Sequence, residues 1–336
     1  MSSIGADTAT MPSRRLRLGP QQLNELGLII IILALYAVFW STARGFISLN
    51  NQLNILRDAA SIGIAAWGAT FIIIAGEIDV SVGPMVALLS VLMSFCLQWH
   101  LSLALGMLVA LAGGAAFGAL AGVLRAYFNV PSFVATLGLW SALRGTALFV
   151  TNALPVTFKD NDFLDMIGDE VFGLPVSAVV MLVLFAVFAF ASRNTAFGRS
   201  VFAVGGNASA AHLAGIKVKR VRVLLFMIAG LLAGVTGILL TARLGSGNAG
   251  AASGLEFDVI AAVVVGGTSL SGGRGSMLGT LFGVIVITLI GNGLVLLGIN
   301  PFFQQVVRGV IIVVAVLANI MATSRGSRRL TRGAGG

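Results

Sequence analysis

Long apolar runs separated by short polar segments dominate the chain. A bilayer core about 30 Å thick needs roughly 20 apolar residues in helical form. The predicted membrane-spanning helices lie at residues 26–42, 58–75, 81–98, 101–124, 132–151, 174–191, 223–242, 256–271, 276–297 and 302–321. The eighth is short and rich in glycine. The pattern therefore predicts an all-α integral membrane protein with about ten transmembrane helices, arranged as a single transmembrane domain over 26–322.

Composition agrees with lipid as the main solvent. Of 336 residues, 57% are hydrophobic and 10% are charged, against about 25% charged in a soluble domain. Lys and Arg number 21 and Asp and Glu 12. The basic residues lie in tails and short loops, as membrane topology requires, and not on a soluble face that would bind nucleic acid.

The distribution of basic residues predicts the orientation. The N-terminal tail 1–25 and the C-terminal tail 323–336 both carry several arginines, and the loop 192–222 carries six Lys or Arg and no acidic residue. The positive-inside rule places all three in the cytoplasm. The loop 151–175 has one basic residue and is expected outside. The first apolar run resembles a signal peptide, but the many later runs favour an uncleaved first span.

Two polar breaks interrupt the apolar pattern. The first reads GEIDVSVGP (76–84) and brings Glu77 and Asp79 between two spans. Irregular backbone at membrane depth occurs where it is buried in protein or lines a wet cavity, and ionisable residues there are often functional. One hypothesis gives Glu77, Asp79 and Ser81 a role in a translocation path or gate. The other has Asp79 or Ser81 capping the third span.

The second break, 266–276, contains the letters LSGG at 270–273, most of a signature found in ATP-binding-cassette ATPases. An ATPase also needs the phosphate loop G-x-x-x-x-G-K-[ST]. The chain has three lysines, Lys159, Lys217 and Lys219, and none follows a glycine in such a loop. The letters therefore predict a tight turn of small residues and no nucleotide site.

Other features argue against catalysis. The single cysteine, Cys96, lies in an apolar run and is expected to be a small buried hydrophobe. His100 and His212 lie far apart, and no paired nucleophile and base or metal-binding cluster is present, so the chain is not expected to be an enzyme.

Asn292 interrupts an apolar run and needs a partner inside the bundle, which makes it a candidate for the path. Small residues at 113–122 predict close helix packing.

Four separated blocks resemble the monosaccharide-type permeases of bacterial ABC importers, which include ribose, xylose, arabinose, galactose and autoinducer-2 permeases. They are GEIDVSVGPMVALLSV (76–91), VPSFVATLG (130–138), the segment 194–222, and 254–299. The resemblance covers about residues 26–322. Glu77 stands where the family usually has glycine, Pro84 where serine is common, and Leu270-Ser271 where Leu-Ala is more usual.

The resemblance implies a permease subunit in the bacterial cytoplasmic (inner) membrane that forms the path for a monosaccharide or a related polyol or sugar derivative. A periplasmic substrate-binding protein would deliver the substrate, and a second copy or a sister permease would complete a dimer. ATP would be hydrolysed by separate cytoplasmic ATPase subunits, and this chain would bind no cofactor. The loop 192–222 would hold the coupling helix, with 208–213 as a short helix of small residues. The residues implied in coupling are Arg199, Gly205, Asn207, Ala210, His212 and Gly215.

An ion-coupled secondary transporter of a small polar solute is the alternative. It would need intramembrane carboxylates at a proton or sodium site. Glu77, Asp79 and Asp258 lie near the ends of predicted spans, which weighs against it. The particular solute stays open.

Overall fold

The computed structural model describes residues 20–159, 162–171 and 173–333, most of which are helical. The helices are α1 (Pro20–Thr42), α2 (Leu49–Ile74), α3 (Val82–Gln98), α4 (Leu103–Tyr127), α5 (Ser132–Thr151), α6 (Asp162–Gly168), α7 (Val176–Asn194), α8 (Ala196–Gly206), α9 (Ala208–Leu213), α10 (Val218–Leu244), α11 (Leu255–Val265), α12 (Met277–Leu296) and α13 (Pro301–Gly333). Short antiparallel pairs join β1 (Val156–Thr157) to β4 (Ser246–Gly247) and β2 (Glu170–Val171) to β3 (Leu174–Pro175).

Seven of the described helices are long and apolar enough to cross a membrane, namely α1 from Gln22 onward, α2, α4, α5, α7, α10 and α12. The all-α membrane class predicted from the apolar runs is confirmed. The predicted number of ten membrane-spanning helices is not confirmed. The predicted span 256–271 is wrong in length, because α11 ends at Val265 and Gly267 follows with a positive φ of 88°. Its 11 residues reach about 17 Å, well short of a bilayer core.

Helix α2 occupies the centre of the bundle. In the most apolar 18-residue stretch of α2, 83% of the residues are buried inside the protein, whereas the corresponding share is 11% in α1 and in α7. The difference reflects the position of α2 in the bundle, because α7, α10, α11 and α12 all pack against it. Trp67 is the largest fully buried side chain on α2, and its Nε1 donates a hydrogen bond to the carbonyl oxygen of Met181 on α7.

Glycine allows α4 and α10 to pack backbone against backbone. A Cβ on Gly114 would collide with the carbonyl oxygen of Gly230, and a Cβ on Gly118 would collide with that of Phe226. Dispersion contacts at this short separation replace the hydrophobic drive that is absent in lipid. The close packing predicted for the small residues at 113–122 is confirmed.

The chain between α2 and α3 is not helical, and side chains satisfy its backbone. The N–H groups of Ile78 and Val80 donate to the hydroxyl oxygens of Ser132 and Thr136 on α5, at 3.1 and 3.3 Å. Polar backbone groups inside a membrane protein need such partners. Helix α3, which has 17 residues, therefore begins only after a non-helical segment that α5 supports.

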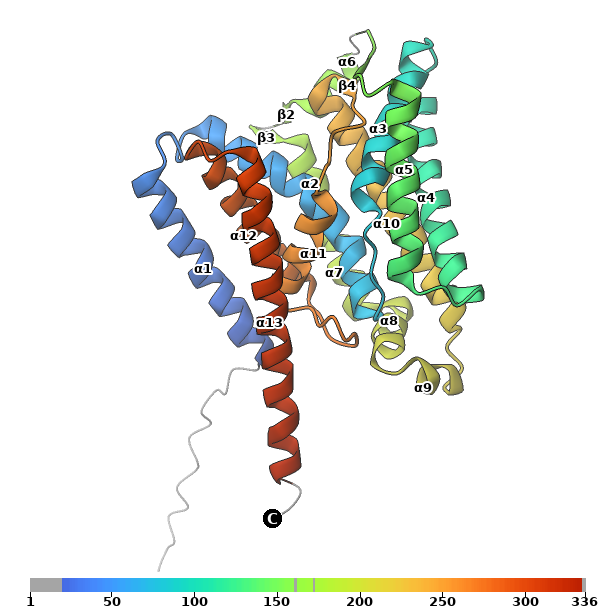
Figure 1. The fold of residues 1–336 in the computed structure, drawn as a ribbon, viewed down its shortest axis with the longest axis vertical. Coiled ribbons are helices and arrows are strands. Elements are labelled where there is room, and N and C mark those ends of the chain that lie inside the picture. Colours follow the sequence, from blue (N-terminus) through green and yellow to red (C-terminus); the bar gives the residue numbers. More distant parts are fainter. Residues whose placement is uncertain (1–19, 160–161, 172, 334–336) are drawn as a thin grey trace, which may run out of the picture.

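Figure 1 shows which elements share an end of the molecule. Helix α1 begins, and α13 finishes, toward the end that carries α8 and α9, while α6 and β4 lie at the opposite end. The described residues of the segment 151–175 thus lie far from the segment 192–222. We refer to these two ends as the outer-loop end, after the loop 151–175 that the sequence analysis expects outside, and the α8–α9 end.

Candidate functional site

Glu77 lies at the α8–α9 end and is held by two arginines. Its side chain is 3% exposed. Arg125 Nε, at the last turn of α4, donates to both carboxylate oxygens at 2.9 and 2.7 Å, and Arg222 Nε, in the first turns of α10, lies 2.7 Å from Oε1. A buried carboxylate requires such compensation, because desolvation of an unpaired charge costs several kcal/mol. The break after α2, which carries Glu77, is therefore held to both α4 and α10.

Asp79 and Ser81 bond to each other and do not cap α3. The Asp79 Oδ1 atom accepts hydrogen bonds from the Ser81 N–H at 2.8 Å and from the Ser81 hydroxyl at 2.6 Å. Ser81 is the N-cap of α3 but makes no side-chain capping hydrogen bond. The capping hypothesis is wrong for both residues. Both side chains are buried and stabilise the turn that leads into α3.

The turn that carries the letters LSGG packs against Glu77's neighbours. Gly272 and Gly273 have positive φ values of 80° and 74°, and the Gly273 N–H donates to the Ile74 carbonyl oxygen at 2.8 Å. A Cβ on Gly205 of α8 would collide with that same carbonyl oxygen. The tight turn predicted from the sequence is present. It joins the end of α2, the end of α8 and the connection between α11 and α12 at one point.

The short helix predicted at 208–213 is present as α9. Asn207 is its N-cap, and the Asn207 Oδ1 atom accepts a hydrogen bond from the Ala210 N–H at 3.0 Å. Gly215 has a positive φ of 86° and ends the turn after α9. The exposed residues on this surface include Arg199, Asn207, Ala210, His212, Leu213 and Gly215. Leu213, an apolar side chain, is 88% exposed.

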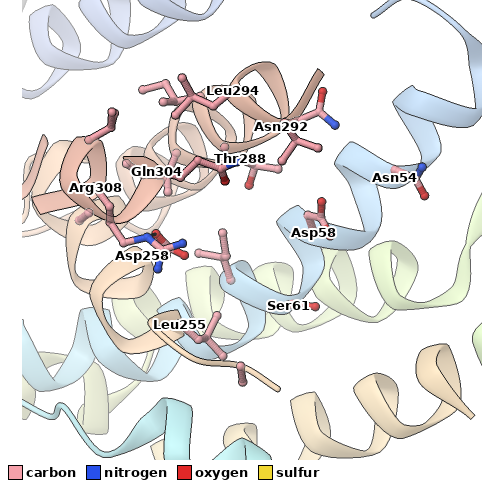
Figure 2. A pocket seen from close by; sticks show the side chains of 18 of the residues that line it. Asn54, Asp58, Ser61, Leu255, Asp258, Thr288, Asn292, Leu294, Gln304 and Arg308 are labelled. Carbon is pink, nitrogen blue, oxygen red and sulfur yellow. Dashed lines mark ion pairs between the residues drawn. The ribbon is translucent and has the colours of Figure 1, made fainter. Parts of the chain in front are cut away.

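A cavity of about 600 Å³ lies between α2, α10, α11, α12 and α13. Its walls use the first half of α2 and the last half of α12, so it lies toward the outer-loop end. Asn292 lines it, and Figure 2 shows Thr288 and Asn292 on α12 with Asp58 on α2. Glu77, Asp79 and Ser81 do not belong to its lining. The four residues predicted for a path or gate are therefore at two separate places.

Asn292 finds the partner that its position requires. Its Nδ2 donates to the Asn51 Oδ1 at 2.9 Å, and the Asn51 Nδ2 donates to the Asn292 Oδ1 at 3.0 Å. Asn51 also donates to the carbonyl oxygen of Phe46 at 2.9 Å. The expectation of a partner inside the bundle is confirmed. The pair joins α2 to α12 at the cavity.

Two ion pairs lie in the cavity wall. Asp258 of α11 and Arg308 of α13 form an ion pair at 2.6 Å, and Asp58 of α2 pairs with Arg243 of α10 at 2.7 Å. Figure 2 shows the Asp258 and Arg308 side chains turned toward each other. Gly254 makes room for the first pair, because it is the N-cap residue of α11 with a φ of 82°, and a Cβ there would collide with an Arg308 nitrogen. The cavity thus carries charge of both signs, each neutralised within the wall.

Several of these residues were not identified from the sequence. Arg125 and Arg222 could have been inferred as a class, because a buried Glu77 requires a cation and both arginines stand at the ends of predicted spans. The sequence gives no such signal for Asp58, Arg308 and Asn51, because the residue that pairs with each of them lies on another helix. In the part of the chain that the structure describes, no group of three or more His, Cys, Asp or Glu side chains could hold a metal ion.

Comparison with known proteins places these features in a family. A family described as "Branched-chain amino acid transport system / permease component" matches residues 51–316. The probable ABC transporter permease protein YphD of Escherichia coli K12 is 71% identical over 92% of this chain and 93% of its own length. No solved structure matches.

Two further relatives carry the name of a sugar. The ribose import permease protein RbsC of Escherichia coli K12 is 36% identical over 88% of this chain and 94% of its own length. The L-arabinose ABC transporter permease protein AraH of Azospirillum brasilense is 34% identical over 94% of this chain and 93% of its own length.

Proposed function

The chain belongs to the family of branched-chain amino acid transport system permease components, and we propose that it forms the membrane path of an ABC importer for a monosaccharide or a related polyol or sugar derivative. It is a multi-pass protein of the bacterial inner membrane, and its family consists of transport permeases and not of enzymes. The observation that carries the proposal is the likeness to ribose and arabinose permeases over nearly their full length.

The chain crosses the membrane ten times in this proposal, with both termini in the cytoplasm. Eight passes use α1, α2, α4, α5, α7, α10, α12 and α13. The other two combine a half-helix with extended chain, α3 after 77–81 and α11 after 245–254. Such broken helices occur where the backbone is buried in protein or lines a cavity. An even number of passes agrees with the basic residues in both tails.

The α8–α9 end would receive the ATPase. Its support is the exposed Leu213, the small side chains of α9 and the junction at Gly205, which joins α8 to the break after α2. Movement of α8 would thereby reach Glu77 and the start of α3. Arg199, Asn207, Ala210, His212 and Gly215 form the rest of this coupling surface. ATP binds to the partner ATPase, and the chain itself takes no cofactor.

The outer-loop end would receive a periplasmic substrate-binding protein, and a second copy of the chain or a sister permease would complete the dimer. The cavity forms the outer part of the path. The Glu77 cluster, with Arg125 and Arg222, acts as an inner gate that the coupling surface opens. Asp79 and Ser81 hold the turn on which this gate is built.

The proposal is tested by co-purification followed by reconstitution. The chain, tagged at its C-terminus, is purified in mild detergent from its native cell, and partners are identified by mass spectrometry. A stoichiometric ATPase with its own phosphate loop, and uptake of ribose or arabinose in proteoliposomes that requires ATP and the binding protein, are the expected results. Transport by the chain alone, abolished by an uncoupler, would instead establish the ion-coupled alternative.

A further inference from the structure

We infer that the cavity is itself a saturable binding site for an uncharged, polyhydroxylated solute of monosaccharide size, so that this chain selects its cargo in addition to any delivering protein. The inference rests on the proposed function. The volume of the cavity, about 600 Å³, falls within the range of about 300–1,000 Å³ that is usual for small-molecule sites.

The charge of the cavity wall favours a neutral solute. Its lining includes two carboxylates and two guanidinium groups, and all four are consumed in the pairs Asp258–Arg308 and Asp58–Arg243. An anion or a cation entering the cavity would meet no unpaired charge of opposite sign among the lining residues. It would have to break an ion pair to replace its lost hydration. A neutral solute has no such requirement.

The remaining polar groups suit hydroxyls. Amides and hydroxyls line the cavity from three helices and one loop, and each offers donors or acceptors. They are Asn51, Asn54, Ser61, Ser253, Thr288, Asn292 and Gln304. A sugar hydroxyl both donates and accepts, so it can use the capacity that the Asn51–Asn292 pair leaves over, which is the second lone pair of each amide oxygen and one Asn292 N–H. Ion-pair oxygens and nitrogens with spare hydrogen-bonding capacity add to this set.

Thr288 is the residue that points to a ligand. It is 3% exposed, and its hydroxyl has no hydrogen-bond partner among the residues that the structure describes. Threonines in helices usually donate to the carbonyl oxygen four residues earlier, and Thr70, Thr236 and Thr241 do so here. Thr288 does not, although it lies on the cavity. A buried hydroxyl without a partner is costly unless something else pairs with it.

Protection of introduced thiols tests the site without the delivering protein. The chain has a single cysteine, Cys96, which is buried, so C96A gives a background for Thr288→Cys and Ser253→Cys. The permease–ATPase complex in nanodiscs is labelled with a small methanethiosulfonate reagent. Ribose, arabinose and sorbitol at high millimolar concentration should each slow labelling at least threefold, whereas gluconate at equal ionic strength should not. Ser102→Cys, exposed at the turn before α4, is the matched control and should label at one rate throughout.

Thr288→Val adds a functional readout. The substitution removes a hydroxyl and keeps the shape, and it should lower ATP-driven uptake at subsaturating sugar about fivefold, as loss of one neutral hydrogen bond does. Ser94→Ala is the control, because Ser94 is also fully buried with an unpartnered hydroxyl but lies outside the cavity. Its uptake should match the wild type. Both variants should keep the wild-type melting temperature.

The outcomes separate the two claims. If the wild-type complex imports a sugar with ATP but neither thiol is protected, the binding site is refuted and the proposed function stands. Equal protection by gluconate and the neutral solutes also refutes the inference, because it denies selection for an uncharged cargo. If the wild-type complex imports none of these sugars, the proposed function fails, and the site inference fails with it.

Discussion

The Oε1 atom of Glu77 lies 2.7 Å from the Nε atom of Arg222. Glu77 follows the end of α2, and Arg222 stands at the fifth position of α10, directly after the connection from α9. This ion pair is therefore a direct contact between the break before α3 and the segment proposed to meet the ATPase.

Glu77→Gln should destabilise the protein by about 3 kcal/mol, because it removes the buried counter-charge of Arg125 and Arg222, which are themselves only partly buried. The measurement is reversible unfolding in mixed micelles with increasing dodecyl sulfate. Glu170→Gln is the control, since its pair with Arg57 is partly exposed and should be worth less than about 1 kcal/mol. Equal losses for both variants would contradict the central role of the cluster.

Asn51 and Asn292 should show measurable energetic coupling. Each amide both donates to and accepts from the other across α2 and α12. Interhelical hydrogen bonds in membrane proteins are worth about 0.6 kcal/mol on average and up to about 1.7. A double-mutant cycle with Asn51→Leu and Asn292→Leu, followed by unfolding in mixed micelles, should give a coupling energy of at least about 1 kcal/mol. Additive single losses would mean that the pair contributes nothing jointly.

Gly205→Ala should abolish ATP-driven uptake or reduce it at least tenfold. The new methyl would meet the Ile74 carbonyl oxygen, which accepts the hydrogen bond of the Gly273 N–H, and would separate α8 from the break after α2. Gly206→Ala, one residue later, is the matched control because nothing lies within 4 Å of its added Cβ. Uptake in proteoliposomes is measured beside ATP hydrolysis. Normal uptake by Gly205→Ala would rule out this junction as the transmission point.

Ala210→Trp should weaken binding of the ATPase at least tenfold, because an exposed small residue on α9 would be replaced by a bulky one at the proposed contact. Retention of the ATPase during size-exclusion chromatography measures the effect. Ala196→Trp, also exposed and on α8, should leave the complex intact. If the two substitutions act alike, the contact is not centred on α9.

The sequence alone was sufficient for the features that depend on local hydropathy and local turn chemistry. The apolar runs predicted α5 and α12 to within a residue of their bounds, and the small residues after Asn207 predicted α9. The reason is that a spanning segment in contact with lipid must be apolar and must satisfy its backbone hydrogen bonds internally, which an apolar helix does. The need of Asn292 for a partner followed from the same constraint.

Only the tertiary structure decided which distant groups meet. Glu77 pairs with an arginine 48 residues later, and Asn292 pairs with an asparagine 241 residues earlier. Side-chain type does not encode which helices become neighbours, because lipid solvates every apolar face equally and close backbone approach selects the contacts. The same packing shortened α11 relative to its apolar run, since glycine at 266 and 267 lets the chain turn against Gly279 and Asn24. The cavity exists because five helices converge there, and the sequence of no single segment predicts it.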